Sequence, residues 1–118
     1  MSEFQYFDVE QCDDITVVRL ASPDLFDTEH YAELRRELVE FVERQRPKKL
    51  LVLFSRVRYC STALISALLL VKDHIETEDG LIKLSGMNDT AREVFENLKL
   101  AGTVFDIYTD ESAAREAF

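Results

Sequence analysis

Residues 50–70 read LLVLFSRVRYCSTALISALLL, which is an apolar run, a short polar segment and a second apolar run. The first run, Leu50 to Phe54, shows no alternation of apolar and polar residues. Such runs are typical of strands buried on both faces, as in parallel sheets covered by helices. The second run predicts a helix from about Thr62 to Glu78, ending before Gly80. Its inner stripe comprises Leu64, Ala67, Leu68, Val71 and Ile75, while Ile65, Leu69 and Leu70 make its first half apolar on nearly all sides.

Strands and helices continue in both directions from this stretch. Upstream, FQYFDVEQ and ITVVRLA are rich in aromatic and β-branched residues and flank CDD, which predicts a β-hairpin with its turn at Cys12–Asp14. A helix is expected next, with Asp27 or Thr28 as N-cap and Pro47 as its stop. Its inward positions are Tyr31, Leu34, Leu38, Phe41 and Val42.

Downstream, LIKLS predicts a strand and NDTAREVFENLKL a helix with Asn88 as N-cap. Val94, Phe95 and Leu98 are expected to face inward from that helix. The strand VFDIY and a short helix opened by Asp110 complete the pattern. The order predicts one α/β domain over residues 1–118, with a single mixed, mostly parallel sheet opened by a hairpin and about four helices.

Composition bounds the classes of function. Of the 118 residues, 47% are hydrophobic and 31% are charged, which suits a globular protein. No apolar run approaches the roughly 20 residues that span a bilayer. The acidic N-terminus, MSEFQYFDVE, does not resemble a signal peptide, so we expect a protein of the bacterial cytoplasm. The net charge of -9 would repel nucleic acid and anionic lipid. This acidic charge either serves only to keep the protein soluble or attracts a basic patch on a protein partner.

Nothing in the sequence indicates catalysis, a metal or a cofactor. The three glycines are isolated at positions 80, 86 and 102, so no glycine-rich phosphate loop is present. Cys12 and Cys60 form no CxxC pair, and no HxxxH spacing occurs. His30 and His74 are interpreted as surface or capping residues. We therefore expect a protein that works by binding, with no catalytic residue, metal ligand or cofactor.

Ser61 and Thr62 place two successive hydroxyls where the apolar helix is about to begin. One interpretation is capping, because a hydroxyl at the N-cap accepts a hydrogen bond from an unpaired helical N–H. The other is a phosphorylation switch, because the free N–H groups and the positive end of the helix dipole favour a phosphate. Spacing alone favours capping.

The whole chain resembles the STAS domain (sulphate transporter and anti-sigma factor antagonist), particularly the stand-alone bacterial anti-sigma factor antagonists. The stretch LVLFSRVRYCSTALISALL is similar to the family's strand, loop and helix start, in which an Asp precedes a phosphorylatable Ser or Thr. An ungapped alignment places Val57 and Tyr59 on the family's Val and Phe, and Ser61 and Thr62 on that Asp and acceptor. LFDTEHYAEL resembles the family's ELDxxxxxxL, with Asp27 on its Asp, and residues 80–118 resemble its final third.

Several positions depart from the family pattern. Ser61 replaces the Asp, Ala63 the second Ser and Leu64 the Gly. Leu53 stands where the family has an Asp at the strand end, and Asp24 where it often has Gly. Losing the two Asp residues removes charges that help a kinase to bind or to position the acceptor.

The resemblance implies an anti-sigma factor antagonist that binds an anti-sigma factor of the serine-kinase, histidine-kinase-like ATPase type, with a phosphatase as a further partner. It implies phosphorylation at Thr62 or Ser61, with Thr62 on the acceptor position and Ser61 as the cap. The partner-binding residues it implies are Asp24, Asp27, Tyr59, Ser61, Thr62 and Ala63. The alternative is a STAS scaffold or small-ligand-binding module without phosphorylation, which the loss of the two Asp residues supports.

Overall fold

The computed structural model describes residues 6–20, 28–57 and 62–118, in which strands and helices follow the predicted order. The strands are β1 (Phe7–Cys12), β2 (Ile15–Leu20), β3 (Lys49–Leu53), β4 (Leu81–Ser85) and β5 (Asp106–Tyr108). The helices are α1 (Thr28–Gln45), α2 (Thr62–Thr77), α3 (Asp89–Asn97) and α4 (Glu111–Glu116).

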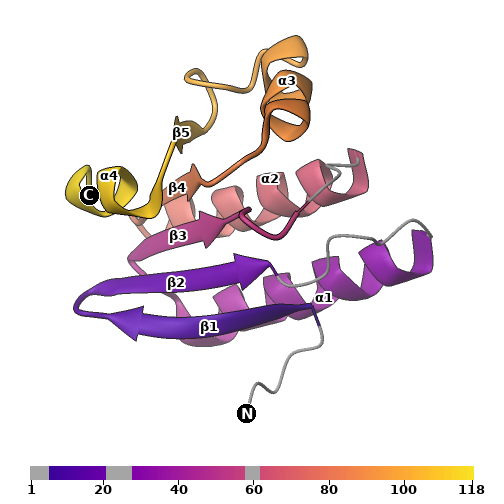
Figure 1. The fold of residues 1–118 in the computed structure, drawn as a ribbon. Helices are drawn as coiled ribbons and strands as arrows, with labels where there is room; N and C mark the ends of the chain where they lie inside the picture. Colours follow the sequence, from indigo (N-terminus) through magenta and orange to yellow (C-terminus); the bar gives the residue numbers. More distant parts are fainter. Residues whose placement is uncertain (1–5, 21–27, 58–61) are drawn as a thin grey trace.

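The five strands form one sheet in the order β1-β2-β3-β4-β5 (Figure 1). The β1–β2 pair is antiparallel and the other three pairs are parallel. Asp13 forms the hairpin turn with φ of 56°, a left-handed conformation that Asp tolerates. The predicted fold class, including the hairpin and the four helices, is confirmed.

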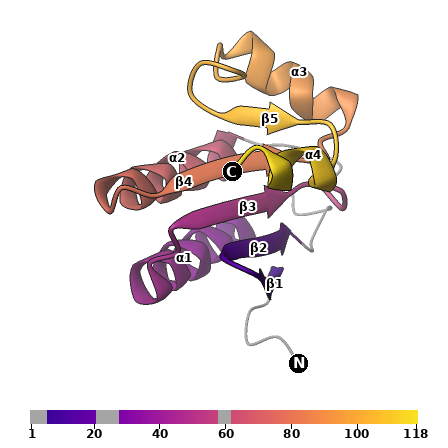
Figure 2. The ribbon, with the colours of Figure 1, turned by 90° about the vertical axis from the view of Figure 1, so that its left-hand side faces the viewer.

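The two faces of the sheet carry different covers. Figure 2 shows α1 and α2 on one side of the sheet and α4 on the other. The α1–α2 side holds the larger core, which includes Phe7, Val18, Leu20, Leu38, Leu50, Val52, Phe54, Leu68, Leu84, Phe95 and Phe105. The other side holds a smaller cluster of Ile15, Val17, Leu51 and Leu53 against Ala114 of α4. β3 is therefore buried on both faces, as its unbroken apolar run predicts.

Polar contacts fix α4 to the hairpin side of the sheet. Arg19 donates a hydrogen bond to Glu111 at 3.4 Å, and Arg115 donates one to the Cys12 sulfur at 3.3 Å. Asp110 caps the helix, since its side chain accepts from the Ala113 N–H at 2.8 Å. These contacts hold a helix of only six residues in place.

One predicted core residue is wrong. Leu98 is not inward but is 49% exposed, because α3 ends at Asn97 and Leu98 is its C-cap. Lys99 then adopts φ of 60°, and the N–H groups of Lys99 and Leu100 bond back to Glu96 and Phe95 in a Schellman arrangement. After this turn the partly buried Leu100, and not Leu98, packs against the core.

The other deviations are small. β3 begins and ends one residue earlier than predicted, and α2 ends one residue earlier, at Thr77. The last strand is confined to Asp106–Tyr108, so residues 104 and 105 precede it. Such shifts at element ends are of the size expected where ends fray.

Candidate functional site

The parallel strands bring the starts of the four described helices to one edge of the sheet. β2, β3, β4 and β5 run in the same direction, so their carboxyl ends lie along one edge. The next helix in the chain, α1, α2, α3 or α4, begins after each of these ends. Ligands and partners of open α/β sheets commonly meet this edge. We call it the carboxyl edge.

The segment that leads from β3 towards α2 is fixed to its neighbours. The Phe54 N–H donates to the Ser85 carbonyl at 2.9 Å, and the Val57 N–H donates to the Phe54 carbonyl at 2.9 Å. Gly86 lies against this segment, since a Cβ built on it would be 3.3 Å from the Ser55 nitrogen. With φ of +77°, Gly86 also has a conformation that favours glycine. Val57 is buried, so residues 54–57 are well anchored.

Asn88 joins the start of α3 to the segment that follows β3. Its side-chain oxygen accepts from the Ala91 N–H at 2.8 Å and so caps α3, as predicted. Its side-chain nitrogen donates to the Val57 carbonyl at 3.4 Å. The second contact was not predicted, because no local pattern pairs residues 31 positions apart.

The start of α2 has the features that the phosphorylation hypothesis needs. Thr62 is the first residue of the helix and is exposed, Ala63 is half-buried, and Leu64 is in the core. The first turn of α2 contains no acidic residue. The positive end of its dipole therefore meets no carboxylate from that turn, which favours an added phosphate.

Four of the predicted site residues, Asp24, Asp27, Tyr59 and Ser61, lie outside the described residues. The position of Thr62 is therefore described, while capping by Ser61 and the roles of the other three residues stay predictions. Leu53, for which the resemblance implies an Asp in the family, is buried in the cluster beneath α4.

Sequence reasoning missed an apolar feature further along α2. The pattern made the first half of this helix apolar on nearly all sides. In the structure Ile65 is buried, but Leu69 is 39% exposed and Leu70 is 43% exposed. The sequence signal that could have indicated their exposure was the position of these two leucines around the helix, away from its inner stripe.

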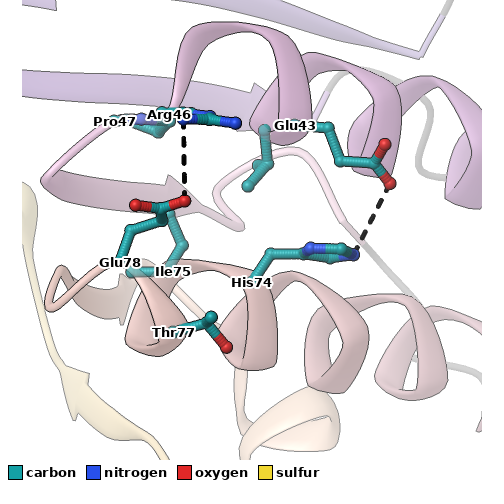
Figure 3. A pocket seen from close by; sticks show the side chains of 8 residues that line it. Glu43, Arg46, Pro47, His74, Ile75, Thr77 and Glu78 are labelled. Carbon is teal, nitrogen blue, oxygen red and sulfur yellow. Dashed lines mark ion pairs between the residues drawn. The ribbon is translucent and has the colours of Figure 1, made fainter.

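A groove of about 350 Å³ lies between the C-terminal ends of α1 and α2, away from Thr62 (Figure 3). His74 and Glu43 approach to 3.6 Å across it, and Arg46 and Glu78 to 3.8 Å. Its charged groups thus pair with one another, and a charged ligand would have to displace these ion pairs.

A buried lysine lies on the sheet face that α4 covers. The Lys83 ammonium donates to the Asp106 carboxylate at 3.1 Å and to the Tyr108 hydroxyl at 3.4 Å. The rings of Tyr108 and Phe118 lie 5.4 and 5.5 Å from it. Burial alone would lower the pKa of Lys83, but its hydrogen bonds to Asp106 and Tyr108 and the Asp106 charge outweigh burial and raise the pKa. The group stays charged and joins β4 to β5.

Within the described ranges, no group of three or more His, Cys, Asp or Glu side chains is placed to hold a metal ion. None of the helices in the described part of the chain has the length and apolar character to cross a membrane.

Comparison with known proteins places this arrangement in a family. No curated protein matches the chain significantly. A STAS domain protein from Planctomyces limnophilus is 16% identical, with a TM-score of 0.82 over 94% of this chain and 96% of that one. An anti-sigma factor antagonist from Mycobacterium paratuberculosis is 19% identical, with a TM-score of 0.80 over 94% and 91% of the two chains.

The phosphorylated form of the Bacillus cell fate determinant SpoIIAA is also similar. It is 19% identical, with a TM-score of 0.67 over 95% of this chain and 99% of that one. At these identities the structures show a shared fold. The profile of the STAS domain matches residues 6–114, almost the full length. The chain therefore belongs to the STAS domain family.

Proposed function

We propose that this protein is an anti-sigma factor antagonist of the bacterial cytoplasm, which releases a sigma factor by binding the anti-sigma factor that holds it. The binding surface is the carboxyl edge around the start of α2. The observation that carries the proposal is the exposed Thr62, which opens a helix whose first turn has no acidic residue. The family and the names of the similar proteins support the same class.

Phosphorylation at Thr62 or Ser61 would switch this binding. A phosphate adds about -1.5 to -2 charges. In the free protein the helix start would stabilise it, because the positive end of a helix dipole favours an anion. In a close-packed complex the same charge would lose its water, and the desolvation cost would separate the partners. The modifying enzyme is then a serine kinase of the ATPase type, which is the anti-sigma factor itself, and a phosphatase reverses the step.

Variants at the two hydroxyls test the switch. The probe is the anti-sigma factor kinase encoded in the same genome, titrated against the purified protein. Thr62→Ala should bind like the parent, and Thr62→Glu should bind at least about tenfold more weakly while keeping the fold. Ser112→Glu adds the same charge to the exposed first turn of α4 and should bind like the parent. Ser61→Ala should lower the free energy of unfolding by about 0.5–2 kcal/mol, as loss of an N-cap does.

Two results would contradict this assignment. If Thr62→Glu binds like the parent and Thr62→Ala melts at the lowest temperature of the set, Thr62 is a cap and not a switch. If no anti-sigma factor kinase binds the parent protein, the proposed function itself fails.

The alternative is a scaffold or ligand-binding module that is never phosphorylated. Leu53 favours it, because the resemblance places this buried leucine where the family has its strand-end Asp, so that carboxylate is missing here. Intact-mass analysis of protein purified from its host, with and without phosphatase, separates the two hypotheses. A satellite heavier by one phosphate that disappears after phosphatase treatment, and that Thr62→Ala and Ser61→Ala together abolish, supports the switch.

A further inference from the structure

Exposed side chains form a stripe along the outward side of α2, beginning at Thr62. Its exposed positions are Thr62, Ser66, Leu69, Leu70, Asp73, Glu76 and Thr77. Steps of three, four and seven residues place them on one side of a helix. The stripe changes in character along its length: two hydroxyls occupy its start, two leucines its middle, and two carboxylates and the Thr77 hydroxyl its end. The leucines thus lie two helical turns from the candidate switch, on the same surface.

The leucines are the exposed apolar part of a surface that continues from Thr62. Five large apolar side chains are exposed in the described residues: Val9, Leu69, Leu70, Leu81 and Leu98. Only Leu69 and Leu70 are adjacent in sequence and share an element with Thr62. A single exposed leucine is ordinary on a protein surface. Two adjacent exposed leucines near a candidate interface indicate an apolar surface that a partner can bury.

Charge indicates which occupant fits. The basic residues of α2, Lys72 and His74, are only half-exposed and lie beside the stripe. Lys72 pairs with Glu76 of the stripe at 2.7 Å, and His74 faces Glu43 of α1. Asp73 follows the leucines with no ion-pair partner among the described residues. With a net charge of -9, a second copy of this chain would bring two acidic surfaces together. An apolar patch with the Asp73 carboxylate at its end, on a protein of net charge -9, instead fits a basic surface with an apolar centre.

We infer that Leu69 and Leu70 form the apolar anchor of the partner interface, and that the occupant is a surface of the anti-sigma factor with an apolar depression bordered by Lys or Arg. This inference rests on the proposed function and extends its surface along α2. Thr62 then lies at one end of the interface and Asp73 at the other. Contacts of the leucines supply affinity, and the position of Thr62 within the same contact explains why a phosphate there would separate the complex.

Matched leucine variants test the anchor against the same anti-sigma factor kinase. Each leucine has about two fifths of its surface left to bury, so Leu69→Gln with Leu70→Gln should weaken binding about tenfold or more. Leu81→Gln and Leu98→Gln make the same chemical change at leucines that are 50% and 49% exposed, and should bind like the parent. Leu70→Met keeps an apolar side chain and should bind within about twofold of the parent.

Asp73→Asn tests the charge of the partner. It should weaken binding by about twofold to fivefold at low salt and reduce the salt dependence of binding, because an exposed charge pair is worth little and is screened. Thermal melts accompany every variant. If the double glutamine variant melts early, the two single variants carry the comparison.

The outcomes separate this inference from the proposed function. If the parent binds and Thr62→Glu weakens binding, but the leucine variants bind like the parent, the proposed function stands and the anchor is wrong. If the parent binds no anti-sigma factor kinase, both fail. If the parent sediments as a dimer that the double glutamine variant dissociates, the stripe is a contact between two copies and the inference is overturned.

Discussion

Asn88 offers a quantitative test of how the carboxyl edge is held together. Its oxygen caps α3 through the Ala91 N–H at 2.8 Å, and its nitrogen reaches the Val57 carbonyl at 3.4 Å. Asn88→Ala removes both contacts. Loss of the cap costs about 0.5–2 kcal/mol, and the long contact to Val57 adds about 0.5 kcal/mol, the lower end for a hydrogen bond. The free energy of unfolding should fall by about 1–2.5 kcal/mol.

Asn88→Asp separates the two contacts. A carboxylate at this position still accepts from the Ala91 N–H and favours the positive end of the α3 dipole, so the cap survives. It cannot donate to the Val57 carbonyl, so that contact is lost while the cap remains. We expect the free energy of unfolding of Asn88→Asp to stay within about 0.7 kcal/mol of the parent.

Denaturant titrations measure the free energies of unfolding, and amide hydrogen exchange shows which residues are destabilised. In Asn88→Asp, exchange should accelerate at residues 55–57 but not at Ala91, whereas Asn88→Ala should accelerate both. Asp110→Ala removes the equivalent cap of α4 and should leave residues 55–57 unchanged. The reasoning is refuted if Asn88→Asp loses as much stability as Asn88→Ala, or if residues 55–57 exchange as in the parent in both variants.

Three further changes probe other parts of the fold. Asp106→Asn should lower the free energy of unfolding by about 1–3 kcal/mol, because it leaves the buried Lys83 ammonium without its anion. Lys83→Met leaves only an exposed carboxylate and should lower it by less than about 1 kcal/mol. Urea titrations measure both changes. Gly86→Ala should lower stability more than Gly102→Ala in thermal melts: both have positive φ, but only at Gly86 does a Cβ meet backbone, at 3.3 Å. Asp14 has a pKa below its usual 3.8 because of its hydrogen bond to a lysine of β3. The stabilising effect of Asp14 is therefore present above pH 3.8 and is lost as pH falls through the folded pKa. The stability of Asp14→Asn should fall less steeply with acid than that of the parent.

The sequence predicted the order of elements because each carries its own periodic or capping signal. The unbroken apolar run of β3, the caps Asn88 and Asp110 and the hairpin turn at residues 13 and 14 are all local features, and each is confirmed. Where the prediction was wrong, a neighbour decided the outcome. Leu98 has the spacing of an inward residue, but the chain turns at Lys99, so Leu100 packs against the core instead.

The candidate site was predictable only in part, for the same reason. The position of Thr62 at the start of α2 follows from the pattern of one helix and is confirmed. The bond from Asn88 to Val57 and the exposure of Leu69 and Leu70 depend on which elements lie beside α2 in space. Periodicity shows which positions share a side of a helix, but it does not show whether anything covers that side.

The strand order has a consequence for how the chain folds during synthesis. Because each strand pairs with the next one along the chain, every strand added to the sheet finds its partner already made. A growing chain can therefore build the hairpin, α1 and β3 in turn from the ribosome outward. The exception is the smaller apolar cluster, whose cover Ala114 is translated after all five strands. Until α4 emerges, Ile15, Val17 and Leu51 stay uncovered, so a stalled or truncated product is the form of this protein that chaperones should recognise most readily.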